Sequence, residues 1–322
     1  MNTKHNDFRS KHFDLSEEAK FRFDILNYKT DGMIFLSTVL IIPFILSIMV
    51  SFIQPGEQGK INFQILYLVS VCVGLIFNCI RNKNGLFKGG YLWIYIFILA
   101  PQVIGVLISS ITLAIFELTE ENKGVVNSFV SVVTMIVTEI IIIALVLKFD
   151  RKIFKRIIET FKTKWKELLV VSIFGLILLS IIVTIIINWL IETLWFGLGE
   201  SSNQEALKSI LNGDYGKTIR IAYIIPLFIL TVVTAPLAEE ICMRNSFNLN
   251  ASNRWLGFVG SAMFFGFIHY GPAFDFEHIL SYSAAGFILS GIFLYTKGNM
   301  TYSWTIHLLN NLLAFILIIA IN

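Results

Sequence analysis

Long apolar runs separated by charged segments form the main pattern of this chain. Each run approaches the roughly 20 residues that a helix needs to cross a hydrocarbon core of about 30 Å. Lipid-exposed backbone must satisfy its own hydrogen bonds, so these runs predict helices and not strands. The candidate spans are residues 33–54, 63–80, 91–116, 125–147, 168–190, 221–238, 257–270, 279–295 and 302–321. Because the run at 257–270 is short, we expect an all-α polytopic membrane helical bundle with eight or nine transmembrane helices.

The composition agrees with a membrane protein. Of 322 residues, 56% are apolar and only 15% are charged, whereas about a quarter of the residues in a soluble domain are charged. The net charge of +3 gives no indication of a nucleic-acid partner. The three cysteines, at positions 72, 79 and 242, show no CxxC spacing, which argues against a cysteine-based zinc site. Frequent Ile, Lys, Asn and Phe indicate an AT-rich genome, so we expect a bacterial plasma membrane.

The distribution of basic residues predicts the orientation. Residues 1–32 are polar and contain no apolar signal-peptide core, so we expect a soluble, cytoplasmic N-terminal tail and a first span that acts as the insertion signal. All but five of the 25 lysines and arginines then fall in cytoplasmic segments, as the positive-inside rule requires. The count places Arg244 and Arg254 in one cytoplasmic loop. With nine spans, the C-terminus lies opposite the N-terminus.

A basic stretch divides the membrane region into two parts. In residues 148–166, lysines and arginines alternate with large apolar side chains at the spacing of an amphipathic helix. Such a helix would lie on an anionic membrane surface, and an ordinary solvated loop is the alternative. We therefore expect an N-terminal four-span region at 33–147, a basic amphipathic cytoplasmic segment at 148–167 and a second membrane region at 168–322.

A few ionisable or strongly polar residues fall inside or at the ends of the predicted spans, where a charge costs about 2.5 to 3.5 kcal/mol on insertion scales. Glu139 is isolated, and we expect it to pair with an intramembrane cation such as Arg244. We expect His278, in an external loop with Asp275 and Glu277, to be solvated. The other members of this set are Glu239, Glu240, Arg244, His269, His307 and Asn311.

Several of these residues recur at helical spacing. The pairs one turn apart are Glu240 with Arg244, Phe265 with His269, and His307 with Asn311. Glu240 and Arg244 have the spacing of an ion pair. Glu239 is rotated by about 100° from Glu240, so it is free to address a different point. Three helices can therefore direct a carboxylate and two imidazoles, one with an amide beside it, into one cavity.

That combination suits hydrolysis of an amide bond within a membrane. A desolvated carboxylate and a histidine can hold and deprotonate a water molecule, and a histidine and an asparagine can stabilise the oxyanion. Glu239, His269 and His307 would also suit a zinc ion, although the HExxH motif is absent. A proton pathway is a further alternative.

The same residues resemble a known family, the CPBP intramembrane peptidases, which process CAAX proteins or bacteriocins and are also called Abi proteins. The motifs are EExxxR at Glu239 to Arg244, FxxxH at Phe265 to His269, and HxxxN at His307 to Asn311. Pro236, shortly before the first motif, also resembles the family. The resemblance covers the chain from about residue 190 onward, and it implies that residues 168–322 hold a catalytic membrane core.

The resemblance implies a role for each motif residue. Glu239 would be the catalytic base, His269 its partner in activating water, and His307 with Asn311 the oxyanion-stabilising pair. Glu240, Arg244 and Phe265 would support them. The implied protease is glutamate-dependent or zinc-dependent, and its substrate is a membrane-associated peptide or protein, with bacteriocin processing or self-immunity as possible roles. The alternative is a non-proteolytic scaffold, immunity or regulatory protein that keeps the fold.

The predicted boundaries leave one conflict of depth. If Arg244 is cytoplasmic, Glu239 lies near the membrane edge, whereas His269 lies about 22 Å beyond Arg254 along a helix. The conflict disappears if the helix that carries Glu239 extends deeper than its apolar run, with Pro236 as a possible break, or if the stretch after Arg254 starts outside the membrane.

Overall fold

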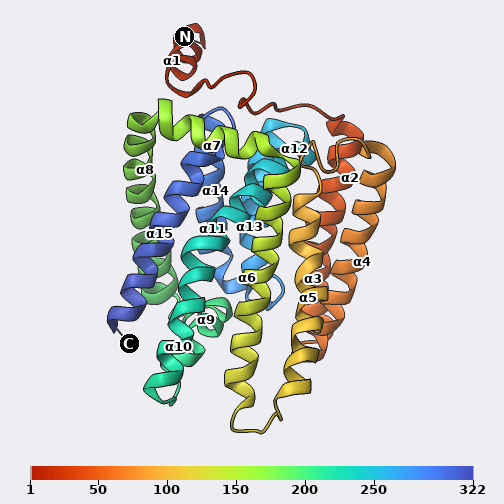
Figure 1. Cartoon of the computed structure of the whole chain (residues 1–322), viewed down its shortest axis with the longest axis vertical. Helices are drawn as coiled ribbons and strands as arrows, with labels where there is room; N and C mark the ends of the chain where they lie inside the picture. Colours follow the sequence, from red (N-terminus) through yellow and green to blue (C-terminus); the bar gives the residue numbers. More distant parts are fainter. Residues whose placement is uncertain (1, 322) are drawn as a thin grey trace.

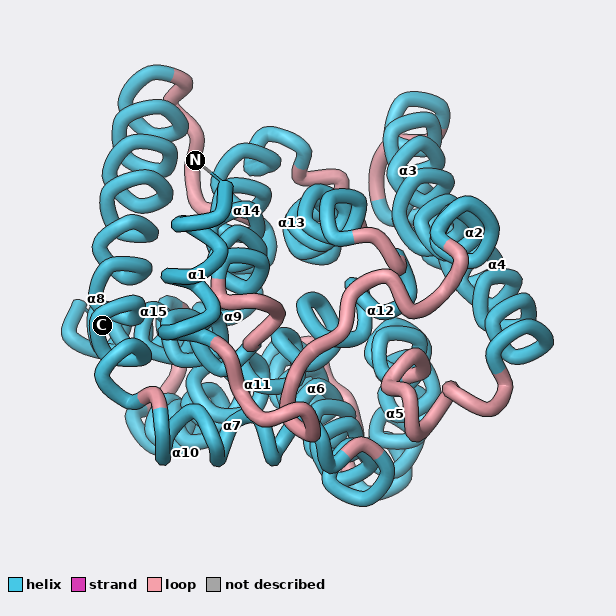
Figure 2. Tube along the Cα trace, turned by 90° about the horizontal axis from the view of Figure 1, so that it is seen from above, coloured by secondary structure: helices cyan, strands magenta, loops and turns pink. Residues whose placement is uncertain are grey.

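The computed structural model describes residues 2–321, which form a bundle of long, roughly parallel and antiparallel helices (Figure 1). No strand occurs among these residues, as the tube in Figure 2 also shows. The all-α prediction is therefore confirmed. Eight helices are long and apolar enough to cross a membrane. They are Tyr28–Ile53, Glu57–Asn82, Trp93–Ile115, Lys123–Phe149, Trp165–Trp195, Lys217–Ala251, Phe276–Tyr295 and Met300–Ala320.

Several of these spans are built from consecutive helical segments. The first contains α2 (Met33–Leu36) and α3 (Ile42–Ile53), and α4 (Glu57–Asn82), α5 (Trp93–Ile115) and α6 (Lys123–Phe149) are the next three. The fifth contains α8 (Trp165–Leu179) and a π-helical stretch, Ser180–Trp195. The sixth contains α10 (Lys217–Phe228), α11 (Ala235–Glu239) and α12 (Phe247–Ala251), with π-helical stretches Ile229–Thr234 and Glu240–Ser246 between them. The last two contain α14 (Ile279–Tyr295) and α15 (Met300–Ile321).

A further apolar helix, α13 (Arg254–Tyr270), packs against α14 and α12. With 17 residues it is about 26 Å long, slightly less than a full membrane crossing. This helix contains the short apolar run at residues 257–270, which is why the sequence predicted either eight or nine spans. The two termini of the chain lie at opposite ends of the bundle (Figure 1), as expected for nine crossings.

The side chains divide into a packed interior and an apolar periphery. Buried aromatic residues such as Trp93, Phe247 and Phe264 fill the centre of the bundle. Large apolar side chains such as Val106 and Ile173 are more than half exposed on the outside. A helix that is apolar on all sides is typical of a bilayer, so this chain is an integral membrane protein.

The polar N-terminal tail is docked along one end of the bundle and is not a free extension. After α1 (Asn2–Phe13), the chain crosses the helix ends to reach α2 (Figure 2). Arg9 Nε donates to Tyr295 O at 2.9 Å, and Arg156 Nε donates to Ala19 O at 2.8 Å. Burial lowers the pKa of the Arg156 guanidinium to about 10. The tail is therefore part of the folded structure.

The basic stretch forms a helix, α7 (Arg151–Thr163), at the same end of the molecule. Ile153 and Ile157 are buried against the bundle, whereas Ile158 and Phe161 are about half exposed. Its helical form agrees with the amphipathic alternative. One apolar stripe packs on protein, so only the second stripe is available to a membrane surface.

Candidate active site

The motif residues come from three helices that the fold brings together. Glu239, Glu240 and Arg244 lie on the sixth span, Phe265 and His269 on α13, and His307 and Asn311 on α15. The stretch Glu240–Ser246 packs against both α13 and α15. The three helices therefore converge on one region, as predicted.

The sixth span resolves the conflict of depth. The predicted end of this span at residue 238 is wrong, because the helix runs on to Ala251 and is 35 residues long. Glu239 is thus 12 residues, or about 18 Å, from the end of its helix. Arg244 is fully buried and is not a loop residue. The polar residues after Glu239 concealed this extension in the sequence. They are accommodated in the helix because the side-chain amides of Asn248 and Asn250 donate to backbone carbonyls of the same helix.

Pro236 does not break this helix. A proline has no N–H, so it cannot complete the helical hydrogen bond at its position. The stretch Ile229–Thr234 is π-helical, and Ala235 N–H bonds to Leu230 O, five residues back. If the next residue followed the same five-residue register, its N–H would bond to Thr231 O. Pro236 has no N–H, so it cannot donate to that carbonyl. Such π-helical turns occur frequently at functional sites.

Glu240 and Arg244 form the predicted ion pair, with Arg244 Nε 3.3 Å from Glu240 Oε2. Both side chains are fully buried. Ser303 Oγ donates to the same Glu240 oxygen at 2.5 Å, and Arg244 Nη1 donates to Ser261 Oγ at 2.8 Å. The Arg244 guanidinium also lies 5.0 Å from the centre of the Phe265 ring. Glu240 is thus occupied in neutralising a buried cation.

Glu239 faces a histidine and not the arginine. Its Oε2 lies 3.7 Å from His307 Nε2. The other ring nitrogen, His307 Nδ1, lies 3.4 Å from Glu240 Oε1. His307 therefore stands between the two adjacent carboxylates, and both it and Glu239 are more than nine-tenths buried.

His269 is connected to this cluster through Phe265. The Phe265 ring centre is 5.0 Å from that of His269 and 5.6 Å from that of His307. On its other side, His269 stacks on Tyr282 at 4.8 Å. The two histidines thus flank one aromatic ring. Among the described residues, His269 is not brought into an ion pair with Glu239.

Asn311 lies one turn after His307 and donates from its Nδ2 to Thr231 O at 2.9 Å. This is the carbonyl that Pro236 leaves without a helical partner. The amide group carries a second N–H. Asn311 therefore has a structural contact that the sequence did not reveal, and it retains one donor for other partners.

The expectation that Glu139 pairs with Arg244 is wrong. Glu139 is fully buried on α6, and Thr234 Oγ1 donates to its Oε2. Arg244 has Glu240 as its carboxylate partner. Sequence reasoning also missed Ser303, although it stands one turn before His307 and so shares its helix face. Ser261 and Tyr282 gave no comparable signal.

The zinc alternative does not fit this arrangement of side chains. Among the described residues, the only group of three or more His, Cys, Asp or Glu ligand atoms within 4.8 Å of one another is Asp275, Glu277 and His278. Glu239, His269 and His307 are not gathered in this way.

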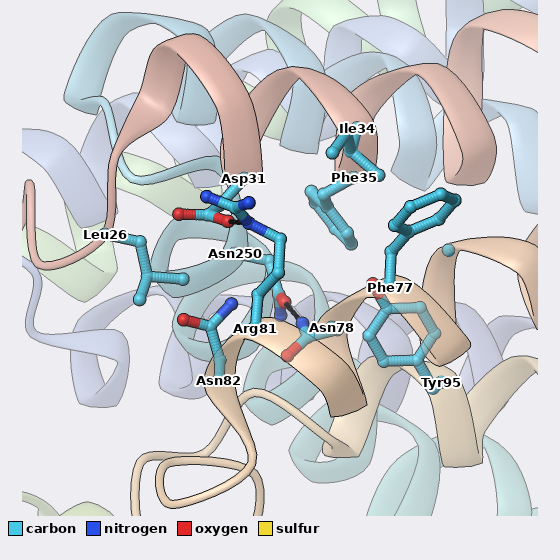
Figure 3. A pocket seen from close by; sticks show the side chains of 11 residues that line it. Leu26, Asp31, Ile34, Phe35, Phe77, Asn78, Arg81, Asn82, Tyr95 and Asn250 are labelled. Atoms are coloured by element: carbon cyan, nitrogen blue, oxygen red, sulfur yellow. Dashed lines mark hydrogen bonds and ion pairs between the residues drawn. The ribbon is translucent and has the colours of Figure 1, made fainter.

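A cavity of about 10 Å³ lies away from the motif residues, at the end of the bundle where the tail docks (Figure 3). Asn78 Nδ2 donates to Asn250 Oδ1 at 2.6 Å beside it, and Arg81 contacts Asp31. A volume of this size holds about one water molecule. The cavity contains none of the candidate catalytic residues.

Comparison with known proteins gives two matches. Residues 221–313 match a family model described as "Rce1-like: Type II CAAX prenyl endopeptidase Rce1-like". The chain is also 29% identical over 314 residues to a protein of Mycoplasma capricolum subsp. capricolum named "Uncharacterized protein". That similarity covers 95% of this chain and 93% of the relative, and so includes the first four spans. No solved structure matches the chain.

Proposed function

Because residues 221–313 form a domain of the Rce1-like type II CAAX prenyl endopeptidase (CPBP) family, we propose that this membrane protein is an intramembrane endopeptidase that cuts a membrane-associated peptide or protein. The observation that carries the proposal is the contact between Glu239 Oε2 and His307 Nε2, 3.7 Å apart in the interior of the bundle. The family consists generally of intramembrane proteases. The proposed peptide substrate follows from that chemistry.

Charge balance favours Glu239 as the base. Glu240 is paired with Arg244, so its carboxylate is not free to take up a proton. The ion-pair partner opposite Glu239 is the Nε2 atom of the His307 ring. If His307 carries protons on both nitrogens, the four groups Glu239, Glu240, Arg244 and His307 sum to zero charge. A neutral cluster reduces the cost of holding these groups at membrane depth.

The proposed reaction uses both sides of this cluster. Glu239 removes a proton from a water molecule that it shares with His269, and the water oxygen bonds to the carbonyl carbon of the substrate. His307 and the free N–H of Asn311 donate to the oxyanion that forms. The C–N bond then breaks, and Glu239 passes its proton to the leaving nitrogen.

Comparative analysis of cleavage products tests this function. Cells that express wild type, Glu239→Gln or the exposed control Glu57→Gln are compared by labelling the new N-termini in their membrane fractions. Wild type and Glu57→Gln should produce a common set of cleavages that Glu239→Gln lacks. If all three produce the same set at equal protein abundance, the chain is a non-proteolytic scaffold or regulator.

A further inference from the structure

A second buried polar cluster lies at the other end of α14 from the docked tail. Asp275, Glu277 and His278 place their ligand atoms within 4.8 Å of one another in the connection between α13 and α14. The expectation that His278 is solvated is wrong, because only 4% of its surface is exposed. Asp275 is similarly buried, whereas Glu277 is open to solvent.

The hydrogen bonds of His278 define which nitrogen is available. His278 Nδ1 lies 3.0 Å from Glu192 Oε2. A carboxylate can only accept, so Nδ1 carries the proton and Nε2 of the neutral ring has a free lone pair. That Nε2 is buried and has no hydrogen-bond partner among the described residues. It lies 3.9 Å from Asp275 Oδ1, which is also an acceptor.

In the neutral ring, Nε2 and the Asp275 carboxylate are two facing acceptors that a metal cation between them would satisfy, whereas a second proton on Nε2 would satisfy them without a metal. A metal-binding histidine usually donates its other ring N–H to a carboxylate, which fixes the tautomer and the ring orientation. Glu192 holds His278 in this way, and Ser281 N–H donates to the second Glu192 oxygen at 3.3 Å. The orienting carboxylate is itself buried, with 5% of its surface exposed.

We propose that Asp275, Glu277 and His278 form a binding site for a divalent transition-metal ion of the zinc class, separate from the Glu239 cluster. One imidazole and two carboxylates are ligands that zinc accepts, whereas calcium prefers oxygen ligands alone. Ligand distances of about 2.0 to 2.1 Å in a tetrahedral zinc site place neighbouring ligand atoms about 3.3 Å apart. Nε2 and Oδ1 need to approach by only about 0.6 Å from the 3.9 Å observed.

The position of the site indicates a structural role. Asp275 Oδ2 accepts a hydrogen bond from Ser202 N at 2.8 Å, at the start of α9 (Ser202–Asn212). Asp275 N–H donates to Tyr270 O, the last residue of α13, at 2.9 Å. A bound ion would therefore fasten the end of α13, next to His269, to α9 and to the stretch Ser180–Trp195 that carries Glu192.

Zinc binding to the full-length protein in lipid nanodiscs tests the site. After chelation and removal of the chelator, zinc is titrated and the bound metal is measured by mass spectrometry. Wild type should bind one zinc per chain. Glu277→Gln and His278→Ala should lose at least tenfold in affinity, and Glu192→Gln should lose about 10 to 100-fold. The exposed carboxylate control Glu205→Gln should bind as wild type does.

Two further variants separate this site from the proposed catalytic cluster. Glu239→Gln and His307→Ala should keep their zinc. If wild type binds no zinc, or if His307→Ala loses the metal while Glu277→Gln keeps it, the assignment is overturned. Glu277 is exposed, so its variant decides the matter even if His278→Ala does not accumulate. Zinc should also raise the unfolding temperature of wild type, and it should leave that of Glu277→Gln unchanged.

Discussion

Two adjacent glutamates in this chain have different surroundings. Glu240 Oε2 lies within 3.3 Å of the Arg244 guanidinium and accepts from Ser303, and its side chain has no exposed surface. Glu239 is 8% exposed. Its ion-pair contact is with His307, at 3.7 Å. The proposal that Glu239 is the base and Glu240 a structural carboxylate rests on this difference in the number of fixed partners.

This difference predicts distinct effects for the two residues. Glu239→Gln should reduce cleavage by about 100 to 10,000-fold, the usual effect of removing a general base, while the protein still accumulates. Glu240→Ala should lower abundance as well, because it leaves Arg244 buried without a counter-charge at about 3 to 5 kcal/mol. Immunoblots of membranes and cleavage assays measure the two quantities.

The double variant Glu240→Ala with Arg244→Ala is the matched control. Because no unpaired charge remains, it should recover part of the abundance that Glu240→Ala loses. An active Glu239→Gln beside an inactive but stably folded Glu240→Gln would reverse the assignment.

At the scale of an element, the sixth span is distinguished by the register of its hydrogen bonds around Pro236. Pro236 has no N–H to donate to Thr231 O in the register of the π-helical stretch Ile229–Thr234, and Asn311 Nδ2 of α15 donates to that carbonyl at 2.9 Å. Asn311, the proposed oxyanion donor, thereby also links two helices.

A double-mutant cycle tests this link. Asn311→Ala should lower the free energy of unfolding by about 1 kcal/mol, because it removes the donor of a partly buried carbonyl. In a Pro236→Ala background, the restored N–H can bond that carbonyl, so the same change should cost less. Denaturation in detergent micelles measures all four proteins. Strictly additive effects would show that Thr231 and Asn311 are not coupled through Pro236.

The helix α7 leads to a prediction about lipids. Its exposed Lys152 and Lys162 lie on the same helix as the half-exposed Ile158 and Phe161. Each basic side chain near an anionic surface contributes about 1 kcal/mol. Nanodiscs with phosphatidylglycerol should therefore raise the unfolding temperature of wild type more than neutral nanodiscs do. Lys152→Gln with Lys162→Gln should reduce that difference, and Lys60→Gln, which lies on α4, should not.

At the scale of the whole molecule, the docked tail and α7 occupy one end of the bundle, and the connection between α5 and α6 occupies the other (Figure 1). The positive-inside rule predicts that the basic end lies in the cytoplasm. Because Arg244 lies in a helix and not in a loop, the number of basic residues in the predicted cytoplasmic segments falls by one. These segments still hold most of the lysines and arginines.

Reporter fusions test this orientation. Fusions within residues 148–166 should report a cytoplasmic location, and fusions within residues 117–124 an external one. Fusions to the two termini should report opposite sides, because α13 would complete nine crossings. If both termini report the same side, α13 does not cross and the chain has eight spans.

The sequence by itself determined the local features of this protein. Long apolar runs fixed the helical class, since backbone in lipid must satisfy its own hydrogen bonds. The spacing of Glu240 and Arg244 predicted their ion pair, because helical periodicity alone places residues four apart on one face. The three motifs indicated the helices that meet at the site.

Only the tertiary structure decided the partners across helices. Arg244 looked like a loop residue because its charge interrupts an apolar run, yet Glu240, Ser261 and Phe265 allow it to be buried. In the same way, Glu139 bonds Thr234, and His278 is buried against Glu192. The contacts of Arg244 with Ser261, of His278 with Glu192 and of Glu139 with Thr234 join residues between 17 and 95 positions apart. Which faces pack together depends on the whole bundle, and no periodicity within one segment specifies it.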